Sequence, residues 1–270
     1  MSQTSSSSAV LDPALPAPPV LEVDLGPGVR AAFTTRAGGT SPAPWDGLNL
    51  GLGVQDDAER VLVHRQAVGR WLGAPLVFGT QVHGVEVRVL SGQDRASRSA
   101  TGAGAETCGE YDALVTAARG LGLGVLVADC VPVLLADAEA GVVGVAHAGR
   151  QGLAEGVVGT VLGALVAQGA RTEKLRAVVG PSACGRCYEV PADLRDEVAS
   201  GRPATASTTS WGTPALDLPA GVVADLLAAG VADVVPTEIC TLEDHRFYSH
   251  RLATRAGVTT GRFAGVVALV

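Results

Sequence analysis

The amino-acid sequence predicts an α/β protein in which mixed sheets are covered by helices within one domain. Apolar residues make up 47% of the 270 positions and charged residues 17%, so the chain can bury a sizeable core and is globular rather than disordered. Short apolar runs separated by glycine recur along the chain, which is typical of strands. Helical patterns alternate with only some of these runs, so mixed sheets are expected.

Ten short runs rich in Val, Leu, Ala and Gly are expected to form strands. Glycine is abundant (35 residues) and aromatic residues account for only 4%, which indicates close backbone packing and tight turns rather than large aromatic surfaces. The predicted strands are residues 29–36, 76–84, 85–90, 112–117, 122–130, 131–137, 141–149, 175–180, 234–240 and 261–270.

The first helix is predicted over residues 55–73. Asp56 and Asp57 stand in cap positions, and Gly73 ends the helical pattern. His64 lies inside this helix among charged residues, so we expect it at the surface.

Three further helices are predicted in the second half of the chain. Residues 152–169 place their Leu and Val side chains along one helical face, and residues 190–198 are a shorter helix. Residues 218–230 carry Pro219 in the first turn and Gly230 at the end, which is the usual asymmetry of a helix.

Two segments differ in composition from the rest. Residues 1–19 are rich in Ser and Pro and lack the basic and apolar regions of a signal peptide, so they are expected to be a flexible tail in front of a single domain, 20–270. Residues 91–110 are rich in Ser, Gly and Ala and are expected to be a mobile insertion.

Composition also limits the location and the partners of the protein. The net charge of −7 argues against binding to nucleic acid or to an anionic membrane. No apolar stretch approaches the roughly 20 residues of a membrane helix. We therefore expect a cytoplasmic monomer or weak homo-oligomer. Its five cysteines fit no complete disulfide scheme and are expected to be buried thiols, ligands or nucleophiles.

Reactive side chains stand at the ends of three predicted strands. His83 follows one strand, Asp129 and Cys130 follow a second, and His147 ends a third. Two imidazoles and a thiolate could bind Zn²⁺ and leave a fourth position open, the arrangement of a catalytic site. The spacing is not a local ligand motif, so hydrogen-bonded loop histidines and a buried cysteine remain the alternative.

Two other groups of residues are open to more than one interpretation. Cys184 and Cys187 have the spacing of half a zinc site or of a redox motif, but without a second CxxC pair a structural turn is favoured. His245 and His250 could be site-wall residues or plain loop residues.

Three arginines follow strand ends or Gly-rich turns in an acidic chain. Arg36, Arg150 and Arg251 could create the local positive field that phosphate binding needs. The alternative is that each arginine pairs with a nearby carboxylate.

Seven segments of the chain, in this order, resemble the laccase-domain family, whose members are also called polyphenol oxidases, purine nucleoside phosphorylases or peptidoglycan-editing factors. The resemblance covers the chain from about residue 29 to the C-terminus. It implies an α/β/β/α layered sandwich with zinc ligands at His83, Cys130 and His147. The segments are TTRAGGTSPAPWDGLNLG, QVHG, YDALVT, ADCVPVLLAD, AHAG, GPSACGRCYEV and CTLEDHRFYSHR.

The resemblance implies zinc-dependent action on purine nucleosides. The expected reactions are phosphorolysis of inosine, guanosine, adenosine and methylthioadenosine, and deamination of adenosine. Arg36 and Arg251 would contact the anion or the substrate, and Asp129 would carry a proton or orient a ligand. In a regular strand Asp129 and Cys130 would face opposite ways, so that role requires a bend, with which Pro132 is consistent.

One segment departs from the family pattern. The family often has HAGWRG where this chain has HAGRQG, so Arg150 stands in the Trp place and Gln151 in the Arg place. If the family Arg contacts phosphate or base, Gln151 weakens that contact unless the Arg150 side chain reaches the same group.

Three other functions remain as alternatives. Cys130 could be the nucleophile and His147 the base of an amidase that edits UDP-muramyl peptidoglycan precursors. Copper-dependent oxidation of phenols would be a side activity of Cu²⁺ at the same ligands, because the five histidines are too few for a multicopper site. A zinc-stabilised binding module would need a fourth ligand, and none is evident.

Overall fold

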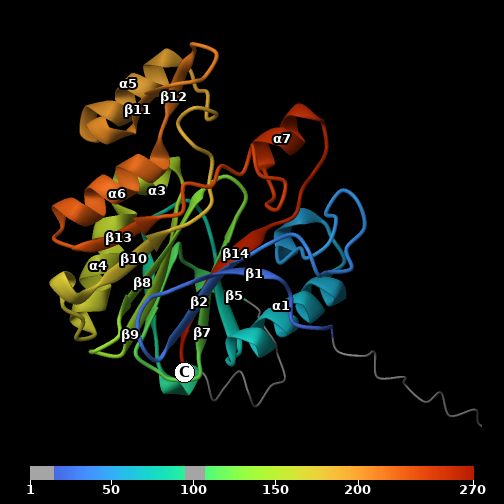
Figure 1. Ribbon diagram of the computed structural model, residues 1–270, viewed down its shortest axis with the longest axis vertical. Coiled ribbons are helices and arrows are strands. Elements are labelled where there is room, and N and C mark those ends of the chain that lie inside the picture. Colours follow the sequence, from blue (N-terminus) through green and yellow to red (C-terminus); the bar gives the residue numbers. More distant parts are fainter. Residues whose placement is uncertain (1–14, 95–106) are drawn as a thin grey trace, which may run out of the picture.

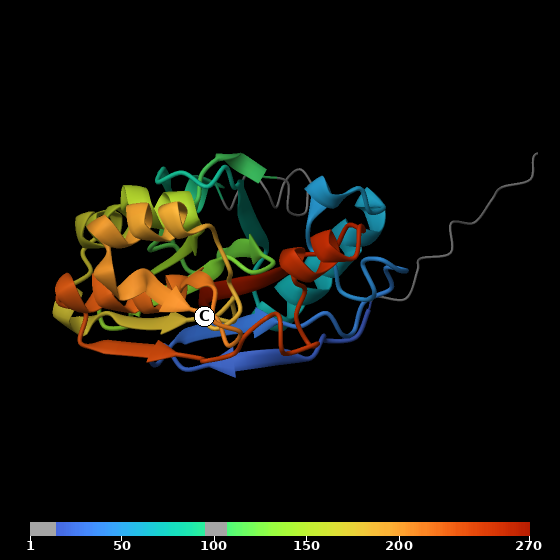
Figure 2. The ribbon, with the colours of Figure 1, turned by 90° about the horizontal axis from the view of Figure 1, so that it is seen from above.

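Two six-stranded sheets pack face to face between two layers of helices (Figures 1 and 2). The computed structural model describes residues 15–94 and 107–270. Both sheets are mixed, since each contains parallel and antiparallel neighbours. The predicted α/β/β/α layered sandwich is confirmed.

The first sheet gathers strands from both ends of the chain. Antiparallel pairing joins β2 to β14 and β14 to β7, whereas β3 runs parallel to β7. In spatial order the strands are β1 (Val20–Val23), β2 (Val29–Thr34), β14 (Phe263–Leu269), β7 (Gly122–Val127), β3 (Leu76–Thr80) and β5 (Thr107–Glu110).

The second sheet has the long β8–β9 hairpin at its centre. Val131 of β8 lies opposite Ala148 of β9, so the start of β8 and the end of β9 meet at one edge. In spatial order the strands are β13 (Asp233–Pro236), β10 (Arg176–Val179), β8 (Val131–Asp137), β9 (Val142–Ala148), β6 (Ala113–Thr116) and β4 (Val87–Leu90). A separate two-stranded ribbon contains β11 (Ala206–Thr208) and β12 (Pro214–Leu216).

Helices cover the outer face of each sheet because each helix has one apolar side. Val68 and Leu72 of α1 pack on the first sheet against Phe78 and Val266. Leucines and valines of α3, α4 and α6 pack on the second sheet. The helices are α1 (Ala58–Leu72), α3 (Arg150–Glu155), α4 (Val157–Ala167), α5 (Ala192–Gly201), α6 (Leu218–Ala228) and α7 (His250–Arg255).

A third apolar layer fills the space between the two sheets. Phe33, Val125 and Val267 of the first sheet meet Leu134 and Val145 of the second sheet, and all five are buried. This inner layer fixes the spacing of the sheets and therefore of the loops that leave them.

The predicted helices agree with the structure to within three residues at their ends except at one glycine, and α7 was not predicted. Asp57 caps α1 by accepting a hydrogen bond from the N–H of Arg60, and Gly73 ends that helix with a φ of 80°. The helix predicted over residues 152–169 is interrupted at Gly156, whose φ of 103° is the left-handed conformation. That residue ends α3 and starts α4, so the chain turns there.

The prediction that His64 lies at the surface is wrong. The side chain is fully buried on α1 beneath the loop that follows β2. Its Nδ1 donates to the carbonyl of Asn49 at 2.9 Å, and its Nε2 accepts from the N–H of Thr40 at 3.0 Å. The loop covers this part of the helix, although its charged neighbours suggested exposure.

The structure also bears on the two segments of unusual composition. The carbonyls of Leu15 and Pro19 accept hydrogen bonds from Arg70 and Thr35, so this part of the predicted tail contacts the packed body. Thr107–Glu110, at the end of the predicted insertion, form β5 beside β3. Residues 1–14 and 95–106 lie outside the described residues.

Candidate metal centre

Three strand ends bring His83, Cys130 and His147 to one place. His83 follows β3, and Cys130 follows β7, which runs parallel to β3, so both residues leave the same edge of the first sheet. His147, near the end of β9, lies opposite Pro132 at the start of β8. Cys130 stands in the link between β7 and β8 and thus joins the two sheets at this edge.

The donor atoms of the three residues converge. Cys130 Sγ lies 3.7 Å from His83 Nε2, and the two imidazole rings are 4.8 Å apart at 71°. One ligand atom from each residue lies within 4.8 Å of the others. The structure therefore brings all three predicted ligands together.

This donor set fits a zinc ion. Neighbouring nitrogen and sulfur donors in a tetrahedral zinc site lie roughly 3.3–3.6 Å apart, close to the observed Nε2–Sγ separation. Two imidazoles and a thiolate also suit copper, since both ions accept soft and borderline ligands. The chemistry of the ligands supports a metal without choosing between the two.

Asp112 organises the site and was missed by the sequence analysis. One of its carboxylate oxygens accepts a hydrogen bond from His147 Nδ1 at 2.7 Å, which leaves His147 Nε2 free to face the other ligands. The carboxylate also accepts from the backbone N–H groups of Val82, His83 and Gly84 at 3.1, 3.0 and 2.8 Å. These bonds hold His83 in its left-handed turn (φ 63°).

Burial raises the pKa of Asp112, but the hydrogen bonds from His147 and from the backbone outweigh it and hold the pKa below its usual range. Asp112 is therefore an ionised carboxylate in a dry environment. The signal in the sequence was a single acidic residue directly before the apolar run ALVT.

Cys130 and His147 form a charged pair in the absence of metal. Burial raises the pKa of the Cys130 thiol, but the attraction of His147 and the hydrogen bonds from both histidines lower it to about 6. Burial lowers the pKa of His147, whereas the Cys130 thiolate and the bond to Asp112 raise it to about 9. A thiolate is therefore present at neutral pH, ready to act as a ligand or a nucleophile.

The bend that an Asp129 role requires is present. Residues 128–130 are not part of a strand, and Asp129 has a φ of 88°. Its side chain accepts hydrogen bonds at 2.6 Å from the Thr241 hydroxyl and from the backbone N–H of Arg251. Asp129 thus anchors the loop before α7 beside Cys130, and its part in proton transfer remains a prediction.

Two of the three predicted arginines lie at the site. Arg251 stacks over the Tyr188 ring at 5.0 Å and donates to the carbonyl of Glu189 at 2.9 Å. Arg150, the first residue of α3, makes no side-chain hydrogen bond or ion pair within the described parts of the chain. Arg36 instead pairs with Asp46 at 3.3 Å.

Cavities lie on either side of the ligands. The larger has a volume of about 770 Å³ and includes Gln81 and Arg262 in its lining. The smaller has a volume of about 290 Å³ and includes Arg150, Gln151, Tyr188 and Arg251. The two cavities share four lining residues, His83, Ala128, Cys130 and His250.

Further lining residues were not found from the sequence. Gln81 bridges to the backbone of Leu126 through two hydrogen bonds of 2.7 Å, which ties the end of β3 to β7. Arg262 donates to the carbonyls of Thr260 and Gly261, and burial lowers its pKa. His250 lines both cavities and is therefore a site-wall residue, one of the two interpretations that the sequence left open.

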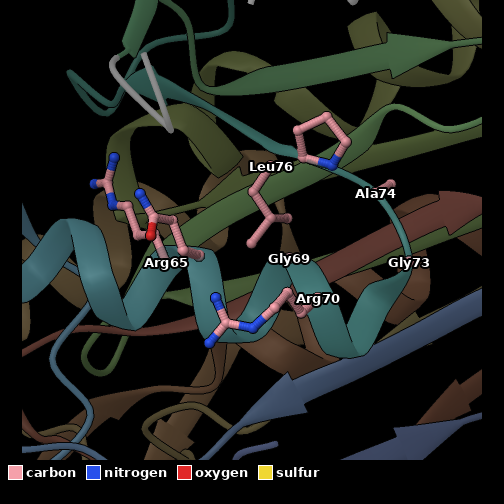
Figure 3. Close-up of a pocket in the computed structure, with 8 residues that line it drawn as sticks. Arg65, Gly69, Arg70, Gly73, Ala74 and Leu76 are labelled. Atoms are coloured by element: carbon pink, nitrogen blue, oxygen red, sulfur yellow. The ribbon is translucent and has the colours of Figure 1, made fainter. Parts of the chain in front are cut away.

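A separate hollow of about 410 Å³ lies along the C-terminal half of α1 (Figure 3). Figure 3 shows Arg65 and Arg70 on the helix and Ala74 and Leu76 on the segment that follows it. Its lining includes no His, Cys, Asp or Glu side chain. Of these three cavities, only the two at the strand ends offer side chains for acid–base or metal chemistry.

Comparisons with known proteins show the family to which this chain belongs. The family model described as multi-copper polyphenol oxidoreductase laccase matches residues 30–270. Purine nucleoside phosphorylase ORF3 of Streptomyces griseus is 51% identical over 239 residues, which cover 87% of this chain and 92% of that protein. Adenosine deaminase RL5, from an unknown prokaryotic organism, is 35% identical over 88% of this chain and 94% of its own length.

Solved structures extend the comparison to three dimensions. The crystal structure of YlmD from Geobacillus stearothermophilus matches with a TM-score of 0.78 and 33% identity, over 90% of this chain and 92% of that one. Among the residues that the structure describes, no helix combines the length and the apolar character that crossing a membrane would require. Sequence and structure agree over nearly the whole chain, which belongs to the family described as multi-copper polyphenol oxidoreductase laccase.

Proposed function

We propose that this protein is a zinc-dependent purine nucleoside phosphorylase. The observation that carries the proposal is the convergence of His83, Cys130 and His147 where two cavities share four of their lining residues. A two-substrate reaction needs adjoining subsites, one for phosphate and one for the nucleoside. The relative from Streptomyces griseus, which bears the name of this activity, supports the assignment.

His83, Cys130 and His147 would hold the zinc ion. When bound, zinc supplies a Lewis acid that withdraws electron density from a substrate atom. Asp112 fixes the tautomer of His147 and the turn that carries His83, so both rings are oriented before any ion arrives.

The smaller cavity is the proposed phosphate subsite. Arg150 and Arg251 line it, and guanidinium groups bind phosphate oxygens through paired, charge-assisted hydrogen bonds. Arg150 is available for this contact because no carboxylate among the described residues pairs with it. It thereby replaces the arginine that the family often has at the position of Gln151.

The larger cavity is the proposed nucleoside subsite. Its volume of about 770 Å³ lies within the usual range for small-molecule pockets. A phosphate oxygen would form a bond to the ribose C1′ as the bond from C1′ to the purine nitrogen breaks, and the departing base would take up a proton. His250 lines both cavities and is the proposed donor of that proton.

The test is phosphate-dependent release of hypoxanthine from inosine, measured together with zinc content. Wild-type protein is expected to contain zinc in this site and to release the base only with phosphate. Cys130→Ala is expected to lose both the zinc of this site and the activity. Zinc-loaded protein that releases no base from inosine, guanosine, adenosine or methylthioadenosine would refute the proposal.

Adenosine deamination is a second proposed activity of the same site. It is supported by the relative named adenosine deaminase, which matches over most of both chains. Release of ammonia from adenosine without phosphate separates this reaction from phosphorolysis.

A Cys-dependent amidase is a competing proposal. The Cys130–His147 pair, with its lowered thiol pKa, has the character of a nucleophile and its base. A Cys–His dyad works without metal, so cleavage of UDP-muramyl peptides that survives chelation would support it.

Phenol oxidation is a further alternative. Oxidation that appears only after Cu²⁺ is added would identify this reaction as a property of copper in place of zinc.

A further inference from the structure

Two turns outside the candidate metal centre have the same pattern of backbone hydrogen bonds. In the first, the N–H groups of Cys187 and Tyr188 both donate to the carbonyl of Cys184 at 2.9 Å. In the second, the N–H groups of Glu243 and Asp244 donate to the carbonyl of Cys240 at 3.1 and 2.9 Å. Each turn therefore presents two side chains three positions apart.

The turns lie side by side because their backbones pair. Ser182 and Cys240 form a parallel bridge, in which the N–H of Ser182 donates to Ile239 at 3.1 Å. The N–H of Thr241 donates back to the carbonyl of Ser182 at 3.0 Å. This pairing places two turns together although more than fifty residues separate them in sequence.

Four potential ligands meet where the turns face each other. One donor atom from each of Cys184, Cys187, Cys240 and Glu243 lies within 4.8 Å of the others. Cys187 and Cys240 are buried, Cys184 is half-buried and Glu243 is exposed, so the cluster opens to solvent on the carboxylate side. Donors around one zinc ion lie roughly 3.3–3.8 Å apart, so side-chain shifts of about 1 Å would complete a tetrahedral set.

Hydrogen bonding alone does not account for this arrangement. Thiols are weak donors and weak acceptors, and a carboxylate has little to gain from a group of them. The Cys187 thiol lies 3.4 Å from Glu243 Oε1, while Glu243 Oε2 faces Arg186 at 3.8 Å. The carboxylate therefore points one oxygen into the cluster, and Arg186 places a positive charge beside what would be an anionic site.

We propose that Cys184, Cys187, Cys240 and Glu243 bind a second zinc ion with a structural role. Three thiolates and a carboxylate would fill all four positions of a tetrahedral zinc ion. A sulfur-rich set that leaves no position open is typical of structural rather than catalytic zinc. The sequence contains no second CxxC pair, but in the structure Cys184 and Cys187 lie beside a C-x-x-E pair, Cys240 and Glu243.

The position of the cluster links it to the catalytic site. Ala183, directly before Cys184, donates its N–H to the carbonyl of Asp129 at 2.9 Å. Thr241, directly after Cys240, donates its hydroxyl to the Asp129 side chain at 2.6 Å. A zinc ion at the cluster would hold both loops and, through Asp129, the neighbouring ligand Cys130.

Metal content of the purified full-length protein tests the proposal. Wild type is expected to bind two zinc ions per chain, whereas Cys240→Ser and Cys130→Ser each bind one. Cys108→Ser is the matched control, because Cys108 lies in neither cluster, and it is expected to retain two ions. One ion in wild type, or two in Cys240→Ser, would overturn the second site. Since zinc is counted directly, this result does not depend on whether the protein cleaves nucleosides.

Thiol labelling of wild type gives an independent test if Cys240→Ser does not fold. Cys184 and Cys108 are both half-buried. In zinc-loaded protein, iodoacetamide is expected to label Cys108 but not Cys184, and removal of zinc with a chelator is expected to expose Cys184. Labelling of Cys184 in the zinc-loaded protein, or a disulfide within the cluster of the purified protein, would contradict the proposal.

Discussion

Asp112 and His147 are joined by a hydrogen bond of 2.7 Å between a buried carboxylate and imidazole Nδ1. Asp112 directly precedes β6, and His147 lies on the neighbouring strand β9; Ala113, directly after Asp112, is paired with Ala146, directly before His147. Sheet register therefore sets the orientation of a candidate metal ligand.

Asp112→Asn should weaken zinc binding at the His83/Cys130/His147 site by roughly 10- to 100-fold, the usual cost of losing a carboxylate behind a ligating histidine. The charge that favours the correct His147 tautomer is removed, while the shape of the side chain is kept. Competition with a zinc-binding dye measures the affinity. Asp137→Asn is the control, because Asp137 also accepts backbone hydrogen bonds while buried but lies at the far end of β8. Equal zinc affinity in Asp112→Asn and wild type would contradict this role.

Gly149→Ala should displace His83 without unfolding the protein. A methyl group at Gly149 would lie 2.5 Å from His83 Cδ2 and 3.4 Å from Cys130 Sγ. The backbone of Gly149 is extended (φ −75°, ψ 171°), a conformation that alanine adopts without strain. We expect the loss of most zinc from this site and a melting temperature close to that of zinc-free wild type, because the ion stabilises only the folded state that binds it. Gly163→Ala in α4 adds the same methyl group where no atom lies within 4 Å, and should retain the metal. Full zinc occupancy in Gly149→Ala would show that the steric argument fails.

Arg150→Gln should raise the KM for phosphate by about 10-fold or more, because a hydrogen bond to a charged group contributes roughly 1.5–3 kcal/mol. The KM for inosine should change little if the two substrates occupy different cavities. Initial rates at varied phosphate concentration provide the measurement. Arg195→Gln, at a surface ion pair with Asp196 on α5, is the matched control. A phosphate KM that stays at the wild-type value would remove Arg150 from the subsite.

Acid should destabilise the protein partly through His64. Burial lowers the pKa of His64 in the folded state, so below its ordinary value of 6.5 the unfolded chain binds the proton more strongly. The free energy of unfolding should fall as the pH drops below about 6.5, by at most about 1.4 kcal/mol per pH unit from this one group. Urea denaturation of wild type and His64→Gln between pH 7.5 and 5 should show a smaller decline in the variant. An identical decline in both would mean that other groups cause the effect.

The sequence predicted the parts of the site that stand at strand ends. His83, Cys130 and His147 follow apolar runs, and the edge of a sheet collects such residues. Asp112 was missed because its function depends on cross-strand register, which a linear sequence does not display. The prediction for His64 failed because the covering loop comes from residues 35–57, and periodicity within a helix carries no information about such a loop.

Two other features of the structure were not predicted. The helix predicted over residues 152–169 breaks at Gly156, where one residue adopts the left-handed conformation while the apolar pattern continues. The Cys184–Cys187 pair looked like an isolated turn because Cys240 and Glu243 are distant in sequence and do not repeat the CxxC pattern. The two turns are brought together by the pairing of Ser182 with Cys240, which is a long-range contact.

The link from β7 to β8 is one of the places where the chain crosses from one sheet to the other, and Cys130 lies on it between His83, which follows a strand of the first sheet, and His147, which lies on a strand of the second. An ion bound there would cross-link the two sheets. Separating the two sheets would then require breaking a coordination bond. On heating, release of the metal and separation of the sheets would therefore occur together.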